Sequence, residues 1–221
     1  MRRGAASVAA VALAVIPLGV TWGLTATQAG LGLWTSLMIS GGVFAGAAQF
    51  AGLELWQNGA PLVAIWSAAF AVNARMLLYG ASLYPWLSKS PPLERFTIVT
   101  LLSDANWATS MKAAERGERD IPGFLFGGGL TLWIAWMIGS AAGMVFAREL
   151  AHPERFGFDV LLGAFLWALL TGSWRGRADL LPWVTAAVAA MASVWWLPPN
   201  WHVITGAIAG AAVGMARDAV T

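Results

Sequence analysis

The sequence contains no cysteine and very little histidine. None of its 221 residues is a cysteine, and the two histidines are His152 and His202. The absence of thiols excludes disulfides, thiolate nucleophiles and cysteine-ligated metals. A histidine-based metal site or a serine–histidine–aspartate triad would have almost no candidate residues, so we expect no metal and no cofactor.

Charged residues are also scarce. Asp, Glu, Lys and Arg make up 11% of the chain and hydrophobic residues 58%, whereas soluble domains carry about 25% charged residues. A soluble fold of this length would lack the polar surface to cover itself, so we expect a lipid bilayer as its solvent. The net charge of +2 is small and spread over loops, which argues against a nucleic-acid partner. Neither a Gly-Lys-Ser/Thr phosphate loop nor an HExxH metal motif is present, which argues against ATP hydrolysis and metalloprotease activity.

Apolar runs of membrane-spanning length recur along the chain. A transmembrane helix needs about 20 apolar residues, and turn residues such as Asn58-Gly59 and Pro198-Pro199 separate the runs. Because the runs lack the alternation of strands, we predict an all-α polytopic membrane protein, a single domain over residues 1–221 with seven to eight transmembrane helices. The predicted spans are 6–28, 31–56, 61–87, 94–114, 121–148, 157–174, 178–197 and 201–217. The span 94–114 is the weakest, because Asp104 and Lys112 lie within it.

Lysine and arginine predict the orientation. If the chain has eight spans and an internal N-terminus, more basic residues fall on the cytoplasmic side than outside, as membrane proteins prefer. We therefore predict a cytoplasmic N-terminus. The predicted cytoplasmic residues are Arg2, Arg3, Lys112, Arg116, Arg119, Arg175, Arg177 and Arg217, and the predicted outer residues are Lys89, Arg95, Arg148 and Arg155.

A short internal similarity suggests two repeats. Leu31-Gly32-Leu33 and Phe156-Gly157-Phe158 each follow a glycine-rich run. Many transporters are built from repeats with the substrate site at their interface. Repeats over residues 1–118 and 119–221 are one interpretation, and unrelated halves are the other.

Two charged residues lie inside predicted spans. A charge at the centre of a transmembrane helix costs roughly 2.5–3.5 kcal/mol on insertion scales, so Arg75 and Asp104 are expected to face each other or a watery cavity. Tyr79 follows Arg75 by four residues and shares its helix face. The pair is either a binding site for a charged ligand or a permanent link between two helices.

A stripe of small residues surrounds a buried amide in the second predicted span. Gly42, Gly46 and Gln49 follow one another at helical spacing. Such a stripe either lets two helices pack closely or marks a broken helix whose free amides bind a ligand. Gln49 favours the ligand interpretation, because a buried amide needs partners.

The chain resembles the AzlC-type family, the larger subunit of branched-chain amino acid exporters. The resemblance covers most of the chain and is strongest at Asn73-Ala74-Arg75 with Leu78-Tyr79-Gly80. This sequence departs from the family pattern at Ala48, Met76 and Ala105, where polar residues are usual. Further matching segments are Ile16–Gly19, Phe44–Phe50, Leu102–Asp104, Trp133–Gly139 and Leu162–Phe165.

The resemblance implies a proton-coupled exporter of branched-chain amino acids in the cytoplasmic membrane, with a small hydrophobic partner subunit of the AzlD type. We expect Arg75 and the amides near Gly46 to hold the substrate carboxylate. The predicted residues for the ammonium group are Asp104, Gln49 and Asn73, with Tyr79 beside them. The apolar side chain is expected to lie against Phe50, Trp107 or Trp133. Asp104 is also the expected proton carrier. The alternatives are a membrane scaffold without transport activity and a passive channel.

Overall fold

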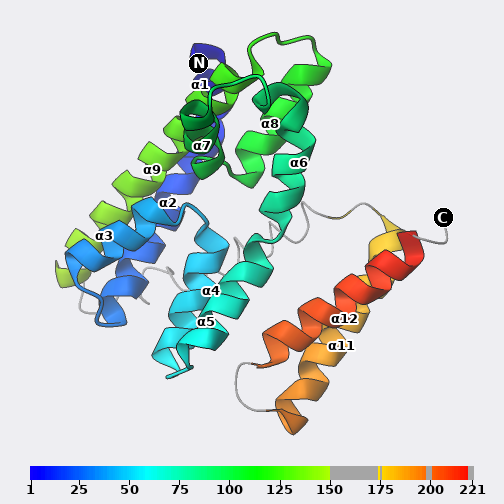
Figure 1. The fold of residues 1–221 in the computed structure, drawn as a ribbon. Coiled ribbons are helices and arrows are strands. Elements are labelled where there is room, and N and C mark those ends of the chain that lie inside the picture. Colours follow the sequence, from blue (N-terminus) through cyan, green and yellow to red (C-terminus); the bar gives the residue numbers. More distant parts are fainter. Residues whose placement is uncertain (150–173, 175, 198–200, 219–221) are drawn as a thin grey trace. The chain divides into compact units, whose positions relative to one another are not determined.

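The computed structural model describes residues 1–149, 174, 176–197 and 201–218, and throughout these residues the regular secondary structure is helical (Figure 1). The chain divides into two compact units, one of residues 1–49 and 73–165 and the other of residues 50–72 and 166–221. The proposed repeat motif at 156–158 and the predicted span 157–174, apart from Trp174, lie outside the described residues. The helices are α1 (Arg2–Ser7), α2 (Ala9–Gln28), α3 (Leu33–Gly42), α4 (Gly46–Gln57), α5 (Leu62–Asn73), α6 (Arg75–Leu87), α7 (Pro92–Thr100), α8 (Asp104–Glu115), α9 (Ile121–Glu149), α11 (Leu180–Trp196) and α12 (Trp201–Asp218).

Four helical segments are long and apolar enough to cross a membrane. They are Ala9–Gln28, Leu62–Leu87, Ile121–Ala147 and Arg177–Trp196. These helices are consistent with a multi-pass membrane protein. The predicted spans 31–56 and 94–114 each fall on two shorter helices instead, so the described residues do not confirm a count of seven to eight.

Helices α2 and α9 lie side by side in the first unit (Figure 1). Small residues allow this approach: a Cβ on Gly23 would stand 2.2 Å from the carbonyl oxygen of Ser140, and one on Gly143 would stand 2.1 Å from that of Val20. The contacts advance together along both helices, from Gly19 near Gly139 to Gly23 near Gly143, so α2 and α9 run in the same direction. Close backbone approach through small residues is the usual way in which membrane helices pack.

The predicted span 31–56 is interrupted at its centre. Helix α3 ends at Gly42 and α4 begins at Gly46, so Val43–Ala45 is not helical. The interruption frees carbonyl groups at the end of α3 and amide groups at the start of α4. In a membrane such groups are tolerated only where protein or a watery cavity satisfies them.

The predicted span 94–114 is also interrupted, at Leu101–Ser103, and its two halves do not cross the membrane as one helix. Tyr79 contacts Asp104 and Ser82 contacts Trp107, so α8 runs in the same direction as α6. Between them α7 returns from the end that α6 has reached (Figure 1). Helices α7 and α8 therefore form a re-entrant hairpin.

The hairpin of α7 and α8 determines which basic loops lie at the same end of the first unit. Leu87 at the end of α6 and Ile121 at the start of α9 belong to one buried cluster, and Arg3 contacts Glu118 before α9. The N-terminus and the loops at 88–91 and 116–120 thus lie at one end of the first unit. The prediction placed Lys89 and Arg95 on the side opposite Lys112 because it counted 94–114 as a crossing, and the described residues do not confirm that placement.

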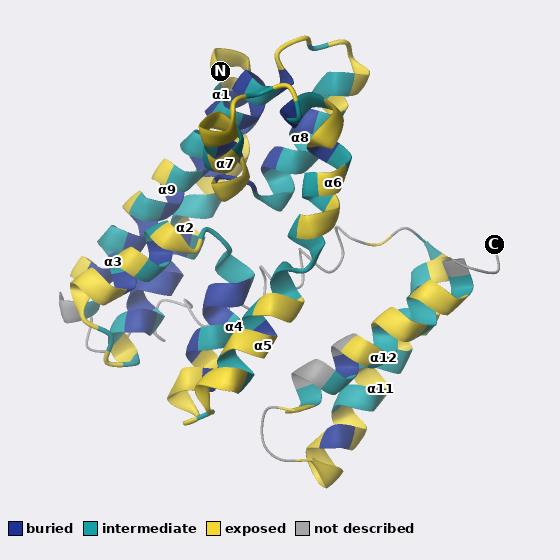
Figure 2. Cartoon of the chain, viewed as in Figure 1, coloured by how far each residue is buried: buried dark blue, intermediate teal, exposed yellow. Residues whose placement is uncertain are grey.

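The second unit contains the hairpin of α11 and α12. Its two helices meet through small residues, with Gly206 facing Ala190 and Gly210 facing Ala186. Large apolar side chains remain uncovered: Trp195 is 86% and Trp196 87% exposed. Figure 2 shows exposed residues along both helices, as expected of surfaces that contact lipid.

Candidate functional site

The two charges predicted to meet form an ion pair. Arg75 Nη2 lies 3.1 Å from Asp104 Oδ2. Arg75 follows Ala74, the single residue between α5 and α6, and Asp104 begins α8, where the helix dipole favours an anion. Ser103 caps α8 by accepting a hydrogen bond from the Asn106 amide. The break before α8 thus places Asp104 where its charge is stabilised and where it offsets that of Arg75.

The pair is only partly buried. The side chain of Arg75 is 28% exposed and that of Asp104 is 39% exposed. The observed exposure leaves both charges accessible to a small molecule.

An aromatic stack stands next to the pair. The rings of Tyr79 and Trp107 lie 4.3 Å apart at an interplanar angle of 12°. The Tyr79 hydroxyl donates to Asp104 Oδ1 at 2.9 Å, and Trp107 Nε1 donates to Ser82 Oγ at 2.8 Å. Both rings therefore keep their polar atoms hydrogen-bonded, and they pack on each other and on the buried cluster that includes Leu83 and Leu87. Ser82 escaped the sequence-based prediction, although its position three residues after Tyr79 places it on the same helix face.

Polar atoms beside the pair remain unused. The Arg75 Nε and the Asn73 Oδ1 atoms are buried and have no hydrogen-bond partner among the described residues. Buried polar groups normally have partners. One unused donor and one unused acceptor on neighbouring residues are what a bound ligand would satisfy.

Gln49 closes the end of the broken helix α3. Its Nε2 donates to the carbonyl oxygens of Ile39 and Ser40, each at 3.4 Å, and to that of Val43. Its Oε1 is buried without a partner among the described residues. These carbonyl groups form a site for a positive or donor group, and the Gln49 amide occupies that site here. Sequence reasoning identified Gln49 but did not identify the carbonyl groups.

The start of α4 lies against α9. A Cβ on Gly46 would stand 3.0 Å from the Trp136 ring, so only glycine fits without displacing that ring. Residues from both breaks pack on one buried cluster. Phe44 lies in the first break and Ala105 follows the second, and the cluster consists of Val8, Ala12, Leu132 and Ala135. The two interrupted segments are therefore brought together around α2 and α9.

Of the predicted site residues, Arg75, Asp104, Tyr79 and Trp107 form one contiguous group. Gln49 and Gly46 lie at the first break. Phe50 is 7% exposed and belongs to the second unit. Among the described residues, no three His, Asp or Glu side chains are grouped as metal ligands would be.

Comparisons with known proteins agree with the motifs. The chain is 26% identical to the "Inner membrane protein YgaZ" of Escherichia coli (strain K12) over 211 residues, which cover 90% of this chain and 83% of that protein. No solved structure matches the chain. The family described as "AzlC protein" matches residues 10–150, which is more than half of the chain and includes the ion pair, the aromatic stack and both breaks. The chain belongs to the AzlC family.

Proposed function

We propose that this protein is the large subunit of a secondary transporter that exports branched-chain and other small apolar amino acids across the cytoplasmic membrane. The observation that carries the proposal is the partly exposed pair of Arg75 and Asp104. An amino acid is a zwitterion, so its carboxylate matches Arg75 and its ammonium group matches Asp104. A substrate that inserts between them replaces one ion pair with two, and neither charge is left alone in a membrane environment.

The neighbouring groups support the choice of an apolar amino acid. The rings of Tyr79 and Trp107 offer the substrate side chain an apolar contact. The unused Nε of Arg75 and Oδ1 of Asn73 supply one donor for a carboxylate and one acceptor for an ammonium group.

The first break offers a second polar surface. Helix α4 begins at Gly46, and amides in the first turn of a helix lack helical acceptors and attract anions. The carbonyl oxygens that Gln49 contacts attract cations. We propose that the substrate contacts these groups in another step of transport, when the Gln49 amide moves away from the carbonyl oxygens.

A proton gradient is the proposed driving force. Asp104 is the acidic partner in the site, and Met76 and Ala105 beside the pair cannot carry a proton. Protonation of Asp104 would release Arg75 and so change the affinity for the substrate carboxylate. We also propose a small hydrophobic membrane protein of the AzlD type as the partner subunit.

Export from vesicles tests the proposal. Proteoliposomes containing the full chain, with and without the partner subunit, are loaded with labelled leucine or valine, and efflux is measured under an imposed proton gradient. Arg75→Ala should abolish efflux, whereas Arg119→Ala, which removes an exposed loop cation, should leave it unchanged. Efflux by Arg75→Ala at the wild-type rate would falsify the site assignment.

A scaffold without transport activity is the rival function, because the 3.1 Å contact of Arg75 and Asp104 also suits a structural link. The double variant Arg75→Asp/Asp104→Arg separates the two. A structural pair tolerates the exchange, so full activity of the double variant favours a role in packing. A binding site does not tolerate it, because the positions of both substrate charges are reversed. A passive channel predicts efflux that is independent of the proton gradient.

A further inference from the structure

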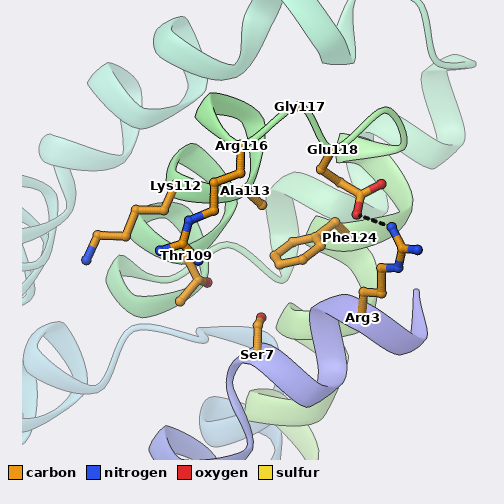
Figure 3. A pocket seen from close by; sticks show the side chains of 9 residues that line it. All are labelled: Arg3, Ser7, Thr109, Lys112, Ala113, Arg116, Gly117, Glu118 and Phe124. Carbon is orange, nitrogen blue, oxygen red and sulfur yellow. Dashed lines mark hydrogen bonds and ion pairs between the residues drawn. The ribbon is translucent and has the colours of Figure 1, made fainter.

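A second polar site lies apart from the ion pair, at the end of the first unit where α1, α8 and α9 meet. An open cavity of about 500 Å³ is bordered by Arg3, by Lys112 and Arg116, and by Phe124 (Figure 3). Its volume falls in the range of about 300–1,000 Å³ that is usual for small-molecule pockets. Phe124 lies in the first turn of α9, a candidate membrane span. The cavity is therefore at the level where a membrane helix leaves the hydrocarbon.

The walls of this cavity carry an excess of positive charge. Three basic side chains border it with one carboxylate, that of Glu118. Arg3 Nη1 donates to Glu118 Oε2 at 3.1 Å (Figure 3), which fixes one cation and neutralises the carboxylate. The side chains of Lys112 and Arg116 have no hydrogen bond or ion pair with any other residue that the structure describes. Two cations thus remain available to an anion.

The remaining polar groups of the cavity cannot act as donors. Thr109 Oγ1 donates to the carbonyl oxygens of Ala105 and Asn106, and Ser7 Oγ donates to that of Gly4. Recognition therefore rests on guanidinium and ammonium groups, which bind phosphate through charge-assisted hydrogen bonds. Lys112 and Arg116 are four residues apart on α8 and present both groups from one face.

We infer that this cavity binds a phosphate group, carried by the headgroup of an anionic phospholipid or by a soluble phosphate compound. The C-terminal end of α8 favours cations through the helix dipole, which explains Lys112 and Arg116 without a ligand. It does not explain the presence of Arg3, which comes from another helix, α1. Phe124, 6% exposed, adds an apolar wall. Basic pockets of this kind at the ends of membrane helices suit lipid headgroups.

The test measures lipid retention by the full chain. The protein is purified from nanodiscs of equal phosphatidylcholine and phosphatidylglycerol, and native mass spectrometry measures the lipids that it retains. We expect at least a tenfold preference for phosphatidylglycerol. Lys112→Gln/Arg116→Gln should reduce this preference at least fivefold. The matched control Lys89→Gln/Arg119→Gln removes two exposed cations from the same end outside the cavity and should change the preference less than twofold.

A second arm distinguishes the two sources of phosphate. Inorganic phosphate is titrated against the protein in nanodiscs of phosphatidylcholine alone. Binding to the wild type but not to Lys112→Gln/Arg116→Gln, without a lipid preference, assigns the site to a soluble phosphate compound. If neither phosphatidylglycerol nor phosphate distinguishes the two proteins, or if the control loses as much as the cavity variant, the inference is wrong. Equal melting temperatures of the variants establish that each is folded.

Discussion

Tyr79 lies flat against Trp107, with ring centroids 4.3 Å apart and planes 12° apart. The Tyr79 hydroxyl reaches past the edge of the stack to donate to Asp104. One aromatic residue of α6 thereby orients both the acidic group and the indole of α8. The Tyr79 hydroxyl and the Tyr79 ring therefore have separate contacts, one with Asp104 and one with Trp107, and each can be tested by itself.

Removing only the hydroxyl of Tyr79 should weaken transport without unfolding the protein. In Tyr79→Phe the stack on Trp107 remains, but Asp104 loses a hydrogen bond, and such bonds to charged groups contribute about 1.5–3 kcal/mol. We expect efflux from proteoliposomes to fall about tenfold or more. Tyr84→Phe is the matched control, because Tyr84 is on the same helix and is 63% exposed. Equal activity of Tyr79→Phe and Tyr84→Phe would exclude a role for the hydroxyl.

Removing the amide of Gln49 should expose the end of α3. Gln49→Ala leaves the carbonyl oxygen of Ser40 without this donor, whereas that of Ile39 keeps the Val43 amide as its donor; an unsatisfied buried polar group costs about 1–3 kcal/mol. Gln49→Glu should be worse, because it places a carboxylate against carbonyl oxygens. The melting temperature in detergent should fall in this order, while the exposed Gln28→Ala remains unchanged. A melting temperature of Gln49→Glu at or above that of the wild type would contradict the assigned hydrogen bonds.

The ion pair of Arg75 and Asp104 was predicted correctly, because two charges inside membrane spans have few ways to be stabilised. A charge inside a membrane span needs a partner, and Arg75 with Asp104 offered the simplest pair. Sequence reasoning was less specific where a local break changes the path of the chain. The glycines around Val43–Ala45 left close helix packing and a broken helix as alternatives, and the structure has the broken helix.

The hairpin of α7 and α8 was not predicted, for a related reason. Residues 94–114 have the length of a span, and length alone does not distinguish one crossing helix from two short ones. The Ser103 cap and the polar residues after it were the available indication of a new helix start. The direction of α8 depends on its contacts with α6, which no local pattern reveals.

Enlarging a glycine between α2 and α9 should destabilise the protein. In Gly23→Ala the new Cβ would meet the backbone of Ser140 at 2.2 Å, so the helices must separate. Overpacking costs about 1–3 kcal/mol, which should lower the melting temperature in detergent by several degrees. Gly80→Ala is the control, since nothing lies within 4 Å of its Cβ position and alanine favours a helix. The two changes should therefore have opposite signs.

The contact of Arg3 with Glu118 should be visible in a titration. The hydrogen bond from Arg3 and those from backbone amides lower the pKa of Glu118 below its ordinary value. The lowered pKa means that this contact stabilises the fold at neutral pH and is lost as the pH falls through the pKa of the folded state. In Arg3→Ala the pKa should rise toward the ordinary value. Carboxyl-labelled glutamate measured by NMR in micelles reports it, and an unchanged pKa would show that Arg3 is not the main cause.

The re-entrant hairpin predicts which loops share a side of the membrane. Because the chain contains no cysteine, single cysteines can be placed in an otherwise natural protein and labelled in cells with an impermeant maleimide. Ser90→Cys before α7 and Arg119→Cys before α9 should react from the same side, because both lie at the end where Leu87 and Ile121 share a cluster. Ala29→Cys, after α2, should react from the opposite side, because α2 runs parallel to α9 and away from that end. Labelling of Ser90→Cys and Arg119→Cys from opposite sides would restore 94–114 as a crossing helix and would separate the loops that the hairpin brings together.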